Sequence, residues 1–539
     1  MADCHRLLIR ILSLPRFQRN AVSRYYIRLD ASFASAKYTL HEDARLTRRK
    51  LVNGRRSVIG LIALLGVMVS TAMLAASVRA EELAQRPSFQ DIRYQENWSV
   101  LTGKDRFYSG DVFDPIKYVP LNEDGSVWVS FGGQIRERVE IWEDFNFGAP
   151  VAADHDDAFL LSRFRMHGDL RVGEHVRVFL EGKSSFATDR GLVGGRRLVD
   201  TDEIDLQNGF VDLSLRMFEG GHFTLRAGRQ EMAFGRQRLV SPLDWANTRR
   251  TFDGVSGIFK LQNWTVTGFW MLLVPVQKYQ FNTSHLSTQL YGIYATGKAP
   301  LTDAISVDLY WLGLRSNVGA FIGTPFAQYN GTVGREHRHT LGGRLWGKID
   351  RTAFDYEVEG AFQIGRVGEG RVDAFMITGQ LGYTFAEFAG VPRLQLGLDY
   401  ASGDDKAGGN VHTFNQLFPL GHAYLGYIDT VGRQNIIDVN PGLSFQAFKK
   451  LVASLEGHLF WRADTHDALY NANGNVVRAG AAGTSSEIGS EVDLLFKYPF
   501  DRHLLGLLGY SHFFSGEFIK QSGPSKDIDF TYLTLQYTF

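Results

Sequence analysis

The sequence of 539 residues predicts an all-β transmembrane antiparallel β-barrel of about 18 strands, with long extracellular loops and short periplasmic turns. Three observations support this fold class: a composition suited to strands, an apolar–polar alternation of period two, and connections that are alternately long and short. The mean hydropathy of −0.15 excludes a helical membrane protein. A barrel keeps this average near neutral because lipid-facing and lumen-facing residues alternate along each strand.

The composition comes first among these observations. The chain contains 57 Gly, 13% aromatic residues and only 14 Pro. Aromatic residues favour strands and form girdles at membrane interfaces. These totals therefore suit a membrane barrel better than two or three ordinary soluble domains.

The first 80 residues resemble a removable targeting region. Arg55 and Arg56 precede an apolar run from Val58 to Val69, and small residues lead to Ala80, the predicted cleavage site of a secretory signal peptide. The alternative is a single transmembrane helix, because 58–78 carries no charge. Residues 1–54 are long for the basic part of a signal peptide, and one explanation is a mis-assigned start, with translation beginning near 51–52.

Charge and cysteine content separate this region from the rest. Residues 1–80 carry 14 Lys and Arg against 4 Asp and Glu, which leaves 44 basic and 54 acidic residues, a net charge of −10, in 81–539. The single cysteine, Cys4, lies in the removable part, so the mature chain holds neither a disulfide framework nor a thiolate metal site. We expect 81–125 to form a periplasmic lead or plug segment and 126–539 to form the barrel.

The alternation of period two starts at Val127. In the stretch 127–142, apolar residues such as Phe131 and Ile135 occupy one face, Gln134, Arg136, Arg138 and Glu140 occupy the other, and Glu137 interrupts the apolar face once. The strands that follow this pattern are predicted at 127–142, 159–172, 175–184, 204–216, 222–229, 251–261, 264–272, 288–298, 303–314, 338–349, 352–364, 371–385, 393–401, 435–446, 449–462, 486–498, 503–514 and 528–539.

The connections give the third observation. With the first strand running outward, nearly every odd-numbered connection is long, the exception being 365–370, whereas the even-numbered ones are short, such as 173–174 and 262–263. Outer-membrane barrels have this pattern, with long loops outside and tight turns in the periplasm. The last strand ends on Phe539, and we expect the outer-membrane assembly machinery to recognise that aromatic end.

One stretch carries a family resemblance. The segment GRQEMAFGRQRLVSPLDWANTRRTFDGV (228–255) resembles the signature region of the alginate export family of outer-membrane barrels, and LQNGFVDL (206–213) and TFNQLFPLGHAYLGYID (413–429) resemble other segments of that family. The resemblance covers roughly 100–539. It implies a monomeric eighteen-stranded barrel with an electropositive bore that exports alginate or another polyuronate. The connection 498–503 is short, whereas the family's exporter has a long turn there that occludes the bore. The gate is therefore either supplied by 81–125 or missing.

Arginines supply the physical argument for anion passage. Rings and ladders of Arg select anions in pores, and guanidinium groups hold carboxylates bidentately. The sequence therefore predicts a channel for an anionic polysaccharide or smaller carboxylates, whose candidate pathway residues are Arg136, Arg138, Arg163, Arg165, Arg171, Arg177, Lys183, Arg226, Arg229, Arg236, Arg238, Arg249 and Arg250.

Two alternatives to this pathway remain open. In the first, the same arginines pair with Asp and Glu in the lumen, with Glu140, Asp169, Glu181, Asp205 and Asp212 as partners, and 241–254 is a loop-folding motif in which Trp245 and Phe252 pack and Asp253-Gly254 forms a turn. In the second, the protein is a general anion-preferring porin or a structural or adhesive surface barrel with a plugged lumen.

Enzymatic chemistry has little support. The sequence contains no GxSxG, HExxH or Walker-type motif. The histidines, including His337, His339, His412 and His422, are scattered, so structural or titrating roles are expected and no metal is predicted. We predict no enzyme activity and no cofactor. The expected partners are the lipid bilayer, the anionic substrate, the barrel assembly machinery and periplasmic export proteins; nucleic acid is not among them.

Overall fold

The computed structural model describes residues 86–102, 111–299, 302–317 and 327–539. The predicted signal peptide, residues 1–54 and part of the lead segment lie outside these ranges, so those predictions stay predictions. Short helical segments are η1 (Arg93–Gln95), η2 (Ser99–Leu101), α3 (Asp114–Lys117), η4 (Phe145–Gly148), η5 (Gly421–Ala423) and α4 (Glu517–Ser522). In this part of the chain, no helix has the length and apolar character needed to cross a membrane.

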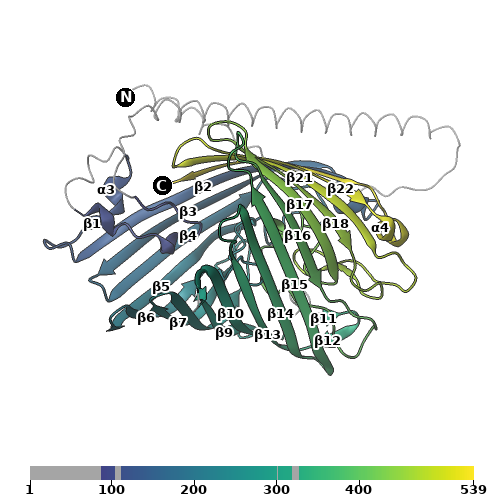
Figure 1. Ribbon diagram of the computed structural model, residues 1–539, viewed down its shortest axis with the longest axis horizontal. Coiled ribbons are helices and arrows are strands. Elements are labelled where there is room, and N and C mark those ends of the chain that lie inside the picture. Colours follow the sequence, from purple (N-terminus) through teal and green to yellow (C-terminus); the bar gives the residue numbers. More distant parts are fainter. Residues whose placement is uncertain (1–85, 103–110, 300–301, 318–326) are drawn as a thin grey trace, which may run out of the picture. The chain divides into compact units, whose positions relative to one another are not determined.

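The main sheet has nineteen strands, of which the two-residue β1 (Val119–Pro120) pairs only with β2, and the other eighteen form the barrel (Figure 1). These are β2 (Val127–Glu143), β3 (Asp157–Val172), β4 (Val176–Ala187), β5 (Asp202–Phe218), β6 (Gly221–Gln230), β7 (Thr251–Leu261), β8 (Trp264–Val274), β9 (Thr288–Ala299), β10 (Thr302–Ser316), β13 (Glu336–Lys348), β14 (Phe354–Val367), β15 (Gly370–Thr384), β16 (Arg393–Ala401), β17 (Ile436–Gln446), β18 (Val452–Trp461), β21 (Glu487–Pro499), β22 (Leu504–Ser515) and β23 (Ile528–Thr538).

The sheet closes between its first and last strands. Every barrel strand pairs antiparallel with its sequence neighbour, and β2 pairs with β23 from Gln134↔Thr538 to Glu143↔Asp529. At the end of this seam, the Gly133 amide donates to the Phe539 carbonyl at 2.8 Å and the Phe539 amide donates to the Gly133 carbonyl at 3.0 Å. A closed sheet leaves no unpaired edge in lipid. The predicted fold class and strand number are confirmed; recognition of Phe539 by the assembly machinery stays a prediction.

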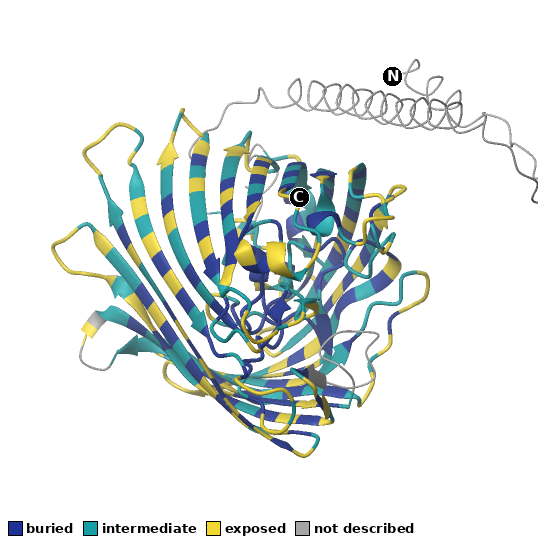
Figure 2. Cartoon of the chain, turned by 90° about the vertical axis from the view of Figure 1, so that its right-hand side faces the viewer, coloured by how far each residue is buried: buried dark blue, intermediate teal, exposed yellow. Residues whose placement is uncertain are grey.

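Burial follows the predicted alternation (Figure 2). On β2, Phe131 and Ile135 are 45% and 39% exposed on the outer face, whereas Gln134 and Arg136 are 2% and 3% exposed on the inner face. The same alternation runs along β14, where Phe362 is exposed between buried neighbours. The outer surface is therefore apolar and the lumen polar, as a lipid-embedded barrel requires.

The turns and loops sit near their predicted places. The connections at one end are short, such as the two-residue turns 219–220 and 262–263, and Gly220 takes the left-handed φ of 77° that a tight turn needs. At the other end the connections are long, except the hairpin between β14 and β15. The loops also contain two small hairpins, β11–β12 (Ala327–Tyr329, Thr332–Gly334) and β19–β20 (Leu469–Tyr470, Val476–Arg478), which the sequence did not predict.

Several long loops fold into the barrel instead of extending from it (Figure 2). The β6–β7 loop (231–250) and the β16–β17 loop (402–435) meet inside, where the Phe418 amide donates to the Leu239 carbonyl at 2.8 Å. Leu239 and Phe418 belong to one buried apolar cluster that also includes Phe252 on the wall. The lumen therefore has a packed core of its own.

The arrangement of the connections predicts the orientation in the membrane. Single cysteines at Ala152 and Asn410, which are exposed in long loops, should react with a membrane-impermeant maleimide on intact cells. A cysteine at Gln262, exposed in a short turn, should react only after the outer membrane is permeabilised. Labelling of Gln262→Cys on intact cells would show that the barrel has the opposite orientation.

Candidate functional site: the polar lumen

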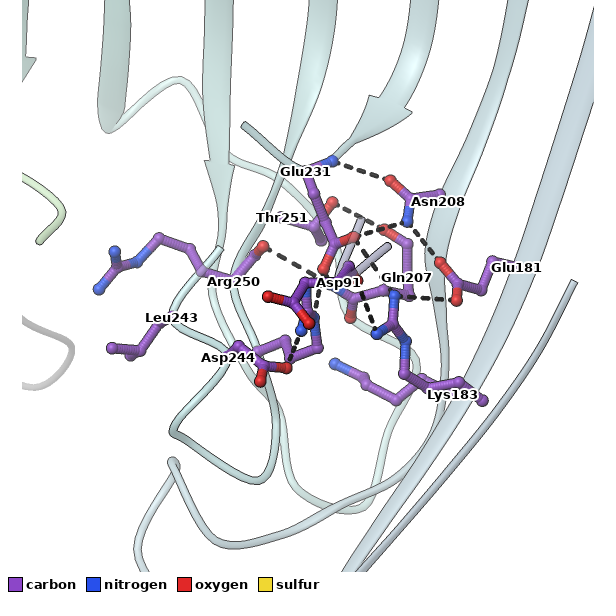
Figure 3. A network of polar contacts seen from close by, with 12 residues as sticks. Asp91, Glu181, Lys183, Gln207, Asn208, Glu231, Leu243, Asp244, Arg250 and Thr251 are labelled. Atoms are coloured by element: carbon purple, nitrogen blue, oxygen red, sulfur yellow. Dashed lines mark hydrogen bonds and ion pairs between the residues drawn. The ribbon is translucent and has the colours of Figure 1, made fainter. Parts of the chain in front are cut away.

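A buried network of charged groups joins the β6–β7 loop to the inner wall of the barrel (Figure 3). Glu231, at the start of the β6–β7 loop, is fully buried and accepts hydrogen bonds from Arg249, from Arg165 at 3.4 Å and from Gln207 and Asn208 at 2.9 and 3.1 Å. Arg249 also contacts Asp244. A buried carboxylate needs this many partners, because removing a charge from water costs several kcal/mol.

Arginines of the first two barrel strands hold the β6–β7 loop against the wall. Arg136 donates to the Asp244 carbonyl at 2.7 Å, Arg138 to the Trp245 carbonyl at 2.8 Å, and Arg163 to both the carbonyl and the carboxylate of Asp244, at 3.0 and 2.8 Å. The Arg138 guanidinium also stacks over the Trp245 ring at 3.8 Å. The signature segment is therefore folded onto an inner wall that supplies its hydrogen-bond donors.

The other candidate pathway residues also face inward, and they contact acidic side chains or backbone carbonyls. Arg171 and Arg177 both bind Asp169, Arg226 binds Asp212, and Arg229 binds Asp205. Arg165 binds Glu181 and Arg138 binds Glu140. These five acidic residues therefore act as the partners that the sequence suggested. Further contacts are Lys183 to Asp202, Arg229 to Asp253, Arg238 to Glu357 and Glu359, and Arg250 to the Ser241 carbonyl.

Arg236 differs from these residues. Its side chain is 51% exposed and contacts Glu357 only at 3.5 Å, while the Glu357 side chain is 11% exposed. The lumen therefore presents the cation of this pair more than the anion. The loop-folding motif is present with one correction: Trp245 and Phe252 pack as expected, but Asp253 and Gly254 lie within β7 and pair with β6 and β8 instead of forming a turn.

The lead segment reaches into the lumen at the short-turn end. The carbonyls of Asp91, Tyr94 and Glu96 accept hydrogen bonds from Arg165 at 3.2 Å, Arg177 at 2.8 Å and Arg171 at 3.3 Å, respectively. The Tyr94 hydroxyl donates to the Glu231 carbonyl at 2.7 Å. Backbone carbonyls of this segment thus occupy guanidinium donors of the first barrel strands.

A second set of contacts fixes the lead segment to the seam. Asp111 lies 3.1 Å from His503 and 3.0 Å from Arg502 in the short β21–β22 turn, and Phe113 stacks on Phe539 at 4.9 Å. Arg93 donates to the Phe539 carbonyl at 2.9 Å. The β21–β22 connection itself spans only 500–503, as predicted. The lead segment therefore lies at the place where the family's exporter was expected to have its occluding turn.

Two cavities adjoin these elements. The far-wall cavity has a volume of about 630 Å³ and is lined by the loop residues Arg236 and Arg238 and by strands β9 to β18. The ladder cavity has a volume of about 500 Å³ and is lined by Arg171, Arg177 and Arg226 together with residues 94–97 of the lead segment. The far-wall lining is mixed in sign: its charged residues are Arg236, Arg238, Lys298, Lys348, Arg393, Asp355, Glu357, Asp399, Asp438 and Glu456.

Some of these lining residues were missed in the sequence. Lys298 and Lys348 lie at strand ends, and Arg393 begins β16, where the alternation is weakest. The ion pairs Arg344–Asp308 at 2.7 Å and Arg433–Asp399 at 2.6 Å were missed as well. Arg344 and Asp308 occupy the polar face of β13 and β10, so the alternation marked them as inward; only their pairing needed the strand register.

The geometry defines an outer-membrane β-barrel with a polar, partly filled lumen. The profile of the family described as alginate export matches residues 127–532, so the chain belongs to the alginate export family. It is accordingly a protein of the bacterial outer membrane. No curated protein matches the sequence.

Solved structures of similar fold come from Pseudomonas aeruginosa. OpdK, solved with vanillate, aligns over 76% of this chain and 98% of its own with 12% identity and a TM-score of 0.50. OccD3 (OpdP) aligns over 79% and 93% with 12% identity and a TM-score of 0.49. At 12% identity, the similarity to OpdK concerns the fold alone.

The central network predicts a strong effect of neutralising Glu231. The change Glu231→Gln leaves Arg165 and Arg249 short of a buried counter-charge and should lower the free energy of unfolding by about 3–5 kcal/mol. The measurement is urea unfolding in detergent. Glu219→Gln, in an exposed turn, is the matched control and should change nothing. Equal stability of the two variants would contradict a central role for the network.

Because Lys117 is buried, we expect the docking of the lead segment to depend on pH. Burial, with help from Arg93, lowers the pKa of Lys117 from 10.5 to about 7. Between these values the undocked segment binds a proton that the docked one lacks, so docking should be weakest below pH 7 and strengthen as pH rises to about 10.

Proteolysis measures this dependence. The rate at which subtilisin cleaves before Val127 should fall with rising pH in the wild type and should show no such trend in Lys117→Met, which keeps the side-chain length without the amine. Parallel pH profiles for the two proteins would exclude Lys117 as the group that titrates.

Proposed function

We propose that this protein is an outer-membrane channel through which an anionic polysaccharide of the alginate type, or smaller carboxylates, passes by electrostatic guidance. Family membership supports a channel of this class. The observation that carries the proposal is the far-wall cavity, where the exposed Arg236 guanidinium faces about 630 Å³ of space while its carboxylate partner is buried. The proposal contains no catalytic step.

The candidate arginines divide into two groups under this proposal. Arg236 and Arg238 line the far-wall cavity and Arg171, Arg177 and Arg226 line the ladder cavity, so these five lie beside space that a carboxylate can enter. Arg236 and Arg171 have the most exposed side chains among them. The other pathway candidates hold the β6–β7 loop and neighbouring strands, and act on the substrate through the shape of the lumen; they are Arg136, Arg138, Arg163, Arg165, Lys183, Arg229, Arg249 and Arg250. One chain forms one pore, since β23 closes on β2.

We further propose that the lead segment is the plug of this channel. Its carbonyls at Tyr94 and Glu96 take donors of Arg177 and Arg171 that a uronate carboxylate would otherwise bind. A polyanion arriving at the ladder cavity competes for the same guanidinium groups. Release of Asp111 and Phe113 from the seam then frees the segment to move.

A specific observation favours a second candidate function. The lumen contains a packed apolar cluster built from the inward loops, with Phe414, Leu425 and Phe518 fully buried in it. Such a core suits a structural or adhesive surface barrel whose lumen stays closed. This candidate predicts no conductance, so electrical recording separates the two functions.

Planar-bilayer recording under a salt gradient tests the channel. The wild type should conduct with anion selectivity and be blocked by oligouronates, with vanillate as a small-carboxylate probe. Exposed ionic contacts contribute ~0.2–1 kcal/mol each, so Arg236→Gln should lower the anion-to-cation permeability ratio by about 1.5- to 5-fold. Arg366→Gln, which removes an exposed guanidinium of β14 that does not line the cavity, is the control. Asp111→Ala with Phe113→Ala should raise the open probability.

Each contrary result has a distinct meaning. A conducting but cation-selective wild type would overturn the arginine pathway. If the wild type is silent and the plug variant conducts, the protein is a channel that its lead segment keeps closed. Silence of both would leave the structural barrel as the function.

A further inference from the structure

The root of the β16–β17 loop brings together three side chains of metal-ligand type. Asp404, Asp405 and His412 each place one ligand atom so that all three atoms lie within 4.8 Å of one another. Asp404 and Asp405 lie three and four residues after the end of β16, and the chain reverses through Gly408 and Gly409, whose φ values of 75° and 91° favour glycine. This reversal returns His412 to the two carboxylates.

One carboxylate oxygen of Asp404 is buried without a hydrogen-bond partner. The residue is 1% exposed, and its Oδ1 atom is buried without a hydrogen-bond partner. Its other oxygen accepts a long bond of 3.4 Å from the His412 amide. A buried carboxylate oxygen without a partner carries a full desolvation cost, which a bound cation removes.

His412 is oriented as a metal ligand is. Its Nδ1 atom lies 3.0 Å from the backbone carbonyl of Asp373 on β15, so it donates there and leaves Nε2 with a free lone pair. Metal-binding histidines commonly donate their other ring N–H to a backbone carbonyl or carboxylate, which fixes the tautomer and the ring.

Surrounding contacts hold the three residues in place. The Asp404 amide donates to Asp467 at 3.0 Å, and the Ser402 hydroxyl donates to the His412 carbonyl at 2.6 Å. The Val411 amide donates to the Arg371 carbonyl at 2.7 Å, and the Asp373 amide donates to the Val411 carbonyl at 3.0 Å, which fixes the returning segment to β15. Asp405 is exposed and leaves the group open to solvent.

We propose that Asp404, Asp405 and His412 bind one divalent first-row transition-metal ion, with Zn²⁺ as the type case, at the long-loop end of the barrel. Two carboxylates and one neutral imidazole match the charge of such an ion, and the imidazole favours it over Ca²⁺ and Mg²⁺, which prefer oxygen ligands. Three protein ligands leave coordination positions for water. The ion would fasten the loop root to β15, next to the loops that fill the lumen.

Metal binding to the full-length, EDTA-stripped protein in detergent tests this site. Calorimetric titration with Zn²⁺ should show one tight site. Ca²⁺ or Mg²⁺ at equal concentration should not displace Zn²⁺ from it. Loss of an outer-shell partner alone costs ~10–100-fold in affinity, so His412→Ala and Asp405→Asn should each weaken binding by at least ~100-fold. Asp405 is exposed, so its variant should keep the barrel fold, checked by heat-modified mobility.

The matched control is His466→Ala, which removes another loop histidine in contact with an aspartate, Asp464, and should leave the tight site intact. Co²⁺ gives a second readout: its visible absorption bands should appear in the wild type and be lost in His412→Ala. Unchanged Zn²⁺ affinity in both Asp405→Asn and His412→Ala, or displacement of Zn²⁺ by Ca²⁺, would overturn the proposal.

Discussion

The pairing of β2 with β23 is the constraint on which the rest of the structure depends. In lipid, each unpaired backbone group costs several kcal/mol, so a sheet of this size is stable there only when its edges meet. Closure fixes the inner and outer faces for every strand, because one residue of slip at the seam would turn apolar side chains inward. It also places Phe539 beside Gly133, where Arg93 and Phe113 of the lead segment contact it.

A closed wall with an arginine-rich inner face requires counter-charges. Arg163 and Arg165 are fully buried, and an isolated buried charge is strongly unfavourable. The protein meets this requirement from two directions: acidic neighbours on the wall, such as Glu181, and inward loop residues such as Glu231 and Asp244. The filling of the lumen and the charge of its wall are therefore linked, since the loop that folds into the lumen also supplies carboxylates to the arginines of the wall.

The sequence predicted the wall well and its contents poorly, for a physical reason. Strand position follows from an alternation within ten to fifteen residues, so all eighteen barrel strands appear near their expected places. The contact of Arg136 with the Asp244 carbonyl joins residues 108 positions apart, and that of Arg93 with Phe539 joins residues 446 apart. No local pattern encodes such pairings. The sequence therefore suggested the acidic partners on the wall, such as Glu181 and Asp212, but not the loop and lead-segment partners, such as Asp244 and the Tyr94 carbonyl.

Exposure, more than the number of arginines, decides what such a lumen can select. A guanidinium held between two carboxylates and a carbonyl has little field to offer a passing ion, whereas one half in water, near a buried partner, attracts anions over roughly a Debye length of ~10 Å at 0.1 M salt. Arg236 is of the second kind and Arg249 of the first. Arg171 and Arg177 lie between these cases, because part of their donor capacity is taken by carbonyls of the lead segment. Movement of a short segment would thus change the number of available cationic sites without any change in the barrel wall.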